Sequence, residues 1–244
     1  MVSELTPATY AAMGATVMLA ACFQGAAGIG FSIIGAPVCA LLFPQLVPGP
    51  LLLLGLPLSI LSWHREAAST DWSLGMAAIA GRFAGTIVAA QCLLVLSAQV
   101  LGLLFAMCIL AAVVLSASGW KVSASRTNLA VAGLAAGVMG TVTSAGGPPL
   151  AIAMQNVQPD RLRATLGCVF TVGSVFSLAA LYLIGQFDIG NMLLGLALLP
   201  CLLAGFSIST RLMRHLSQAG MRRALLGLAT LSALSVIVDA LSKS

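Results

Sequence analysis

The chain has 244 residues, of which 60% are hydrophobic and only 7% are charged, and its formal net charge is +5. Its mean hydropathy of +1.08 excludes an ordinary soluble domain, in which about a quarter of the residues are charged. Apolar runs such as LLLLGLPLSIL at 51–61 lack the alternation of barrel strands. The composition therefore predicts an all-α polytopic membrane protein, whose positive charge indicates basic loops rather than binding to nucleic acid.

Five hydrophobic segments precede a polar linker, and five follow it. The first five cover residues 8–24, 31–43, 50–64, 73–96 and 99–119. The linker, WKVSASRTN, covers 120–128, and the later segments cover 129–142, 148–157, 164–185, 189–210 and 221–241. We therefore expect a first transmembrane repeat at 1–119, a linker at 120–128 and a second transmembrane repeat at 129–244.

Short similarities between the two halves indicate a duplication. Asp71 opens one long segment and Asp188 opens its counterpart, and AGTIV at 84–88 matches AGFSI at 204–208. Weak internal similarity of this kind is typical of transporters that are built from inverted repeats.

The basic residues predict how the halves are oriented, because Lys and Arg gather in cytoplasmic loops. If the first two segments of each half return to the side from which they entered, most basic residues fall on one face and Lys243 on the other. The residues on the shared face are Arg65, Lys121, Arg126, Arg161, Arg163, Arg211, Arg214, Arg222 and Arg223. A single kinked crossing would divide them almost evenly. We therefore expect inverted halves, a cytoplasmic linker and periplasmic termini, with 31–43 and 148–157 either crossing fully or re-entering.

Glycine and proline interrupt the first two segments of each half, in GAAGIGFSIIGAP at 25–37 and GTVTSAGGPP at 140–149. These residues cost roughly 1 and 3 kcal/mol in a helix interior relative to alanine. Non-helical backbone at membrane depth is tolerated only where it is buried in protein or lines a cavity, and half-helix N-termini there can bind an anion. We therefore predict that the two breaks build a substrate site. A glycine seam that only packs helices is the alternative.

The breaks supply amides, hydroxyls and glycines that let the backbone approach a ligand. From the first break the candidate substrate-binding residues are Gln24, Gly28, Gly30 and Ser32, and from the second they are Thr143, Ser144, Gly146, Gly147, Gln155 and Asn156. We expect no catalytic residue, metal ion or cofactor, because no hydrolase or metalloprotease motif occurs. The six cysteines lie singly in apolar runs, as packing residues do.

Arg82 is the candidate from outside the breaks. It lies about 15 Å into the segment that opens at Asp71, at a rise of about 1.5 Å per residue. An arginine near the bilayer centre costs at least about 2.5 kcal/mol, so it marks a functional site by default. We expect its guanidinium to hold an anionic substrate; the alternative is that it bonds freed backbone carbonyls or snorkels. Its counterpart in the second half is Leu202, so the site would not be symmetric in charge.

The two glycine-rich motifs that close on proline, at 25–37 and 140–149, each open one half of the chain. In this the chain resembles the TauE/SafE sulfite-exporter family over nearly its whole length. The first motif departs from the family pattern at Phe31, Ser32 and Ile33, which stand where glycines are frequent. The resemblance implies transport of a small sulfur-containing or organic anion, such as sulfite or a sulfonate, across a bacterial inner membrane.

We therefore expect a secondary transporter that works by alternating access and is not an enzyme. A passive anion channel is the alternative within transport, and a membrane scaffold or a membrane-embedded enzyme is the alternative from another class. The expected partners are the anion and the lipid bilayer. A homodimer is left open, because the G-x-x-x-G spacing of Gly81 and Gly85 can pack helices within one chain or between two.

Overall fold

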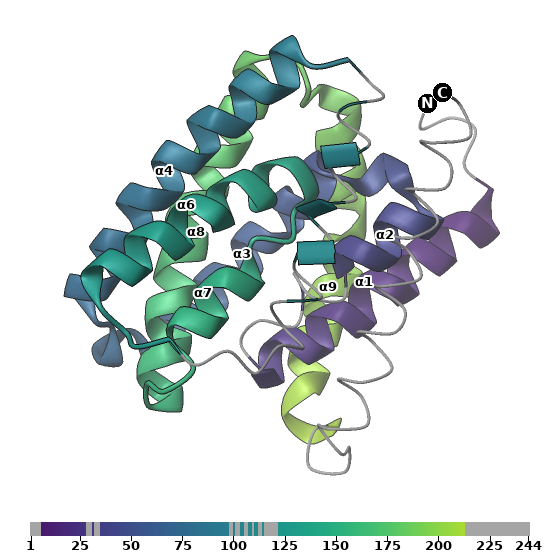
Figure 1. The fold of residues 1–244 in the computed structure, drawn as a ribbon. Helices are drawn as coiled ribbons and strands as arrows, with labels where there is room; N and C mark the ends of the chain where they lie inside the picture. Colours follow the sequence, from purple (N-terminus) through teal and green to yellow (C-terminus); the bar gives the residue numbers. More distant parts are fainter. Residues whose placement is uncertain are drawn as a thin grey trace.

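The structure is a computed structural model that describes residues 6–27, 31, 35–97 and 122–212, with a few positions between 100 and 114. In the first half, the helices are α1 (Pro7–Ala27), α2 (Ala36–Leu42), η3 (Pro44–Leu46), α3 (Gly49–Glu66), η4 (Ala67–Ser69) and α4 (Trp72–Val95). In the second half, they are α6 (Arg126–Thr143), α7 (Gly147–Ala153), α8 (Pro159–Leu183) and α9 (Ile189–Leu212). No strand occurs in these ranges (Figure 1), so the all-helical prediction is confirmed for them. Most of segment 99–119 and all of 221–241 lie outside the described residues.

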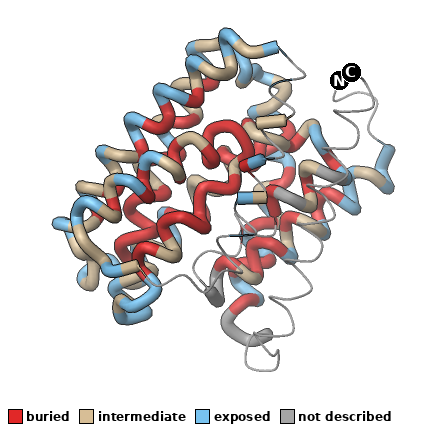
Figure 2. The backbone as a smooth tube through the Cα atoms, viewed as in Figure 1, coloured by how far each residue is buried: buried red, intermediate tan, exposed pale blue. Residues whose placement is uncertain are grey.

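Three of the described helices are long and apolar enough to cross a membrane, namely Trp72–Val95, Pro159–Leu183 and Ile189–Ser209. Large apolar side chains on their outer faces are exposed, among them Phe83 and Ile87 on α4. Burial is concentrated where helices meet (Figure 2). A surface this apolar would favour aggregation in water, whereas lipid solvates it, so the helices form a membrane-embedded bundle.

The described helices form two groups, each with its own hydrophobic core (Figure 1). The first group contains α1, α2, α3 and α9, whose core includes Met13, Leu54 and Leu198. The second group contains α4, α6, α7 and α8, whose core includes Leu129 and Leu166. Each group thus takes helices from both halves of the sequence, since α9 joins the first group and α4 joins the second.

Helices α4 and α6 pack backbone to backbone through four glycines. A Cβ on Gly85 would lie 2.1 Å from a carbonyl oxygen of α6, and one on Gly137 would lie 2.3 Å from the carbonyl oxygen of Arg82. Gly81 and Gly133 approach the facing helix as closely, at 1.9 and 2.2 Å. Small residues permit this approach in membranes, where van der Waals packing holds helices together. The G-x-x-x-G spacing therefore packs two helices of the same chain.

Helices α1 and α9 make the corresponding contact in the first group. A Cβ on Gly205 would lie 2.1 Å from the carbonyl oxygen of Met18, and one on Gly14 would lie 2.9 Å from Sγ of Cys201. The hydroxyl of Tyr10 donates to a carbonyl of α9. In the sequence match between 84–88 and 204–208, Gly205 is the counterpart of Gly85. The equivalent glycines of α4 and α9 therefore each face the first helix of the opposite half.

Charged side chains gather where α3 ends and where α4, α6 and α8 begin. Glu66 pairs with Arg163, and Asp71 pairs with Arg161. Arg126 donates to Ser73 Oγ over 2.7 Å, which attaches the start of α6. We call this end the charged end, and define it by Glu66, Asp71, Arg126, Asp160, Arg161 and Arg163.

Helix α9 begins at the opposite end of the bundle, where Phe187 lies against Gly49 at the start of α3. Asp188 caps α9 by accepting from the backbone N–H of Asn191 over 2.7 Å, and this bond lowers the pKa of the Asp188 carboxyl. Asp71 caps α4 in the same way, through Leu74 N–H over 3.1 Å. An aspartate at this position satisfies one of the free N–H groups of the first helical turn, so both long helices begin where the sequence predicts.

The short helices α2 and α7 follow the two breaks. Helix α6 starts at the charged end, and α7 runs back beside it to the start of α8 at the same end (Figure 1). Gly146, before α7, lies close to the backbone of Ala136 and Gly140, where a Cβ would be 2.6 and 3.1 Å from the nearest atoms. Helix α1 starts beside the first half of α9, and α2 leads to the start of α3 at that same end. Each pair therefore begins and ends at its own end of the bundle: α6 and α7 at the charged end, and α1 and α2 at the end where α3 and α9 begin.

Candidate functional site

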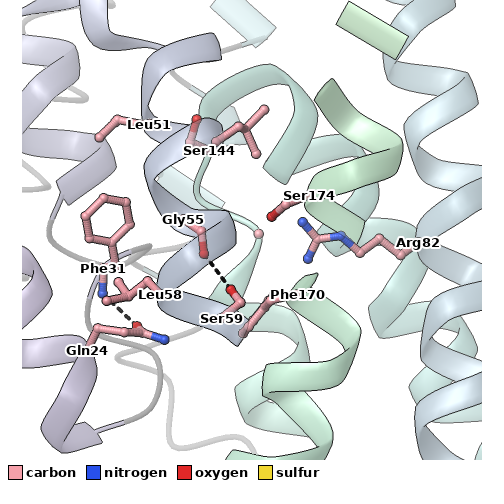
Figure 3. Close-up of a pocket in the computed structure, with 12 residues that line it drawn as sticks. Gln24, Phe31, Leu51, Gly55, Leu58, Ser59, Arg82, Ser144, Phe170 and Ser174 are labelled. Carbon is pink, nitrogen blue, oxygen red and sulfur yellow. Dashed lines mark hydrogen bonds between the residues drawn. The ribbon is translucent and has the colours of Figure 1, made fainter. Parts of the chain in front are cut away.

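A cavity lies between the two helix groups (Figure 3). The first group lines it with Gln24, Phe31, Leu51, Leu52, Gly55, Leu58 and Ser59, and the second with Arg82, Ser144, Gly146, Phe170 and Ser174. The volume open to the centres of water molecules is about 30 Å³, which is room for roughly two waters or a small ion. Residues from both breaks and Arg82 therefore meet at one cavity.

Arg82 is buried, with 2% of its surface exposed. Its Nε and Nη1 atoms have no hydrogen-bond partner in the part of the chain that the structure describes. The guanidinium carbon lies 5.2 Å from the centroid of the Phe170 ring, and Figure 3 shows the group pointing from α4 into the cavity. Among the described residues, Nε and Nη1 therefore bond no backbone carbonyl, and the buried side chain does not reach the surface.

Two glycines make room for this guanidinium. A Cβ on Gly173 would lie 1.8 Å from Nε, and one on Gly140 would lie 3.3 Å from Nη2. Any side chain at 173 would therefore displace the arginine. Helix α8 consequently approaches Arg82 through its bare backbone, and the next residue, Ser174, lies in the cavity wall.

The carboxylates in the described part of the chain are engaged elsewhere. Glu66 and Asp71 bind arginines at the charged end, Asp160 accepts from Ser69 Oγ over 3.1 Å, and Asp188 caps α9. A buried, unpaired cation is costly in a low-dielectric site. No described carboxylate therefore neutralises Arg82.

Hydrogen bonds from the hydroxyl groups of Thr143 and Ser144 stabilise the second break. Ser144 ends α6 in the left-handed conformation, with φ of 61°, which non-glycine residues seldom adopt. Thr143 Oγ1 donates to Met139 O over 2.7 Å and accepts from Ala145 N–H over 3.1 Å. Ser144 Oγ reaches across to the first group and donates to Pro48 O over 2.9 Å. The hydroxyl of Thr143 thus holds the turn, and Ser144 joins the two groups beside the cavity.

Gln24 connects the two sides of the first break. Its Oε1 accepts from the backbone N–H of Phe31 over 2.9 Å, and the side chain is buried. Figure 3 shows Gln24 and Phe31 at the wall opposite Arg82. Three other candidates from this break, Gly28, Gly30 and Ser32, lie outside the described residues.

Comparison with protein families decides what kind of protein carries this cavity. The family model for the sulfite exporter TauE/SafE matches residues 13–236. The chain belongs to the TauE/SafE sulfite exporter family. The resemblance seen in the two glycine-rich motifs is thereby confirmed, and the family is one of membrane transporters. Comparison with curated proteins found no match, and neither did comparison with solved structures.

Four candidates of this TauE/SafE family chain are placed away from the cavity lining. Thr143 and Gly147 are buried within the second break, but neither lines the cavity. Helix α7 ends at Ala153, so Gln155 and Asn156 lie beyond it and are exposed. The structure thus brings Gln24, Arg82, Ser144 and Gly146 together and leaves these four apart.

Several cavity residues of the TauE/SafE chain have no clear signal in the sequence. Ser59, Phe170 and Ser174 are ordinary members of apolar segments, and Gly173 is one glycine among many. A polar residue in the middle of a long apolar segment is a weak hint, and Ser174 offers that hint.

Three further buried hydroxyls lie one helical turn beyond the site: Thr141 Oγ1 bonds Thr86 Oγ1 over 3.3 Å and Ser177 Oγ over 2.8 Å. They tie α4, α6 and α8 together around Arg82.

Gly55 offers a way to fill the cavity without disturbing its walls. Apart from the backbone of its own helix, no described heavy atom lies within 4 Å of where its Cβ would be, and the residue lines the cavity. We expect Gly55→Leu to lose most anion uptake, because the leucine side chain fills the cavity. The protein should keep its melting temperature, because replacing a helical glycine removes a cost of about 1 kcal/mol relative to alanine. Uptake into liposomes and thermal unfolding in detergent measure the two effects. Gly55→Ala is the control and should retain more uptake; unchanged uptake in Gly55→Leu would remove this cavity from the transport path.

Proposed function

We propose that this chain is a secondary transporter of a small anion, in which Arg82 binds the substrate. One observation carries the proposal: the Arg82 side chain, which is 2% exposed, lines a cavity between two helix groups, and two of its guanidinium nitrogens have no hydrogen-bond partner among the described residues. Hydrogen bonds to charged groups contribute about 1.5–3 kcal/mol each, so a bound anion would offset the cost of burying Arg82. The family description favours sulfite or a related sulfonate as the anion.

Within this proposal the substrate-binding residues are Arg82, Ser144, Gly146 and Gln24, which line the same cavity. Gly28, Gly30 and Ser32 belong to the same break as Gln24 but lie outside the described residues, and we propose them as further ligands on the basis of the sequence alone. The two breaks then serve one purpose, which is to bring polar groups of both halves to the anion.

We also propose that the two halves are inverted repeats. The packing supports this, because α4 lies against α6 and α8, while its counterpart α9 lies against α1 and α3. The α1–α2 pair begins and ends at one end of the bundle and the α6–α7 pair at the charged end, as re-entrant hairpins of opposite orientation would. The positive-inside rule places the charged end in the cytoplasm of a bacterial inner membrane and both termini in the periplasm.

Alternating access would then be a relative movement of the two groups about the cavity. The Glu66–Arg163 pair supports this, since Glu66 ends α3 in the first group and Arg163 belongs to α8 in the second. Arg163 Nε donates to Oε1 and Oε2 of Glu66 over 3.1 and 2.9 Å. The pair holds the charged end closed.

This gate gives a testable prediction. We expect Arg163→Gln to change the uptake rate by at most about fivefold, because a partly exposed ion pair contributes about 1 kcal/mol or less. The double variant Glu66→Arg with Arg163→Glu should restore the wild-type rate. Arg161→Gln is the matched control, because Arg161 and its partner Asp71 both belong to the second group. Equal effects of Arg161→Gln and Arg163→Gln would remove the gate from the mechanism.

The proposed function itself is tested with the purified full chain in liposomes. A secondary transporter gives saturable uptake of labelled sulfite that unlabelled anion inhibits. A passive channel gives unitary currents in a planar bilayer instead, and a scaffold gives neither signal. Absence of any anion flux through the reconstituted protein contradicts the proposal.

A further inference from the structure

We propose that the cavity selects small monoanions over dianions and that the Ser174 hydroxyl is the second substrate ligand beside Arg82. This inference rests on the proposed function and concerns the same site. Two observations carry it. One is the set of hydrogen-bond donors that the cavity walls leave unused, and the other is the balance of charge around Arg82.

The hydroxyl of Ser174 has no hydrogen bond within the described residues, although only 4% of the residue is exposed. The other two cavity hydroxyls are engaged: Ser59 Oγ donates to Gly55 O over 2.7 Å, and Ser144 Oγ donates to Pro48 O over 2.9 Å. Ser174 lines the same cavity as Arg82 and directly follows Gly173, against whose backbone Arg82 packs; in Figure 3 both residues lie on the same side of the cavity. Ser174 is therefore the hydroxyl that is placed and available to donate to an oxygen of the same anion.

The charge of the cavity matches one negative charge. Arg82 is the single ionisable side chain among the described residues that line it. The remaining polar groups are a glutamine amide and three serine hydroxyls, which carry no net charge. A monoanion leaves the filled cavity neutral, whereas a dianion leaves one charge unpaired in a low-dielectric site, where unpaired charges are costly.

The walls also favour a compact anion with a small apolar end. Phe31, Leu51 and Leu58 face the cavity from the first group, opposite Arg82 and Ser174. An anion whose oxygens meet the guanidinium and the hydroxyl would direct its other end toward these side chains. A methyl or other small carbon group packs against these apolar side chains. A further charged oxygen would lose its water there without gaining a hydrogen bond, which costs free energy.

Three probes of nearly equal size separate charge from shape: dimethyl sulfone is neutral, methanesulfonate is a monoanion and sulfate is a dianion. Binding of each to the detergent-purified full chain is measured by isothermal titration and by the shift in melting temperature. We expect methanesulfonate to bind at least about tenfold more tightly than either other probe. We expect Ser174→Ala to weaken methanesulfonate about tenfold, the effect of one hydrogen bond to a charged group.

Ser59→Ala is the matched control, because its hydroxyl lines the same cavity but is bonded within α3. It should weaken methanesulfonate clearly less than Ser174→Ala does, because its hydroxyl is already donated to Gly55 O. Sulfate binding as tightly as methanesulfonate overturns the charge selection while leaving anion transport intact. Equal effects of Ser174→Ala and Ser59→Ala overturn the role of Ser174. If neither anion binds the wild-type chain, and sulfite does not bind either, the proposed function fails together with this inference.

Discussion

Arg82→Met should abolish anion transport and leave the protein as stable as the wild type, or more stable. The guanidinium is buried with two nitrogens unpaired, and replacing a buried charge by an apolar side chain of similar volume is often neutral or stabilising. Transport loses two charge-assisted hydrogen bonds, worth together at least about 3 kcal/mol. That corresponds to a rate more than about a hundredfold lower at a given substrate concentration.

The direction of the stability change separates a binding role from a structural one. If Arg82 held the fold together, its removal would lower the stability of the protein. If Arg82 is kept for its ligand, it lowers the stability of the ligand-free protein, and its removal leaves that stability unchanged or raises it. Arg82→Lys keeps the charge but loses the planar fork that binds two oxygens at once, so we expect partial transport. Uptake assays and thermal unfolding without ligand measure both quantities. A lower melting temperature with wild-type uptake in Arg82→Met would falsify the assignment of Arg82 to the site.

Gly85→Ala should destabilise the protein by about 1–3 kcal/mol or more, the usual cost of overpacking. The added methyl group would lie 2.1 Å from a carbonyl oxygen of α6. That oxygen is held in the helix backbone and has no side-chain freedom, so α4 and α6 must separate. Since α4 carries Arg82, the separation also moves the guanidinium, and transport falls as well. Gly137→Ala, whose methyl group would meet the Arg82 carbonyl oxygen at 2.3 Å, should behave alike.

Gly55→Ala is the control for both substitutions. It is also a helical glycine, but no described atom of another helix lies within 4 Å of its added Cβ. All three variants gain the helix propensity of alanine, about 1 kcal/mol, so their difference isolates the contact between the helices. Melting temperatures in detergent and the yield of folded protein give the comparison. If Gly85→Ala melts no lower than Gly55→Ala, then α4 and α6 do not pack as described.

Helix positions were predictable because they depend on neighbouring residues. The segment expected at 73–96 is α4, Trp72–Val95, and the one expected at 189–210 is α9, Ile189–Leu212. Desolvation of about 20 apolar residues and a capping aspartate before each helix suffice for this. Helix α7 is shorter than the segment expected at 148–157, because the chain turns after Ala153. Gln155 and Asn156, which the expected segment includes, therefore lie beyond the end of the helix.

The candidate site was predictable only where a residue was unusual in its own surroundings. Arg82 stood out because a charge in the middle of an apolar segment has a large cost. Ser174 and Gly173 did not, since serine and glycine are common in membrane helices. Their importance comes from the position of Arg82 against the backbone of α8, and that contact joins residues about 90 positions apart in the chain.

The sequence alone determined a membrane-embedded helical chain, two breaks rich in glycine and proline, and one arginine at mid-depth. Each of these follows from short-range chemistry: the hydration of apolar groups, the backbone preferences of single residues and the cost of a charge in lipid. Only the tertiary structure decided that α4 joins α6, that α9 joins α1, and that Arg82 and Ser174 line the same cavity. Helix pairing depends on which small side chains let two backbones approach, and that depends on surfaces formed by distant parts of the chain.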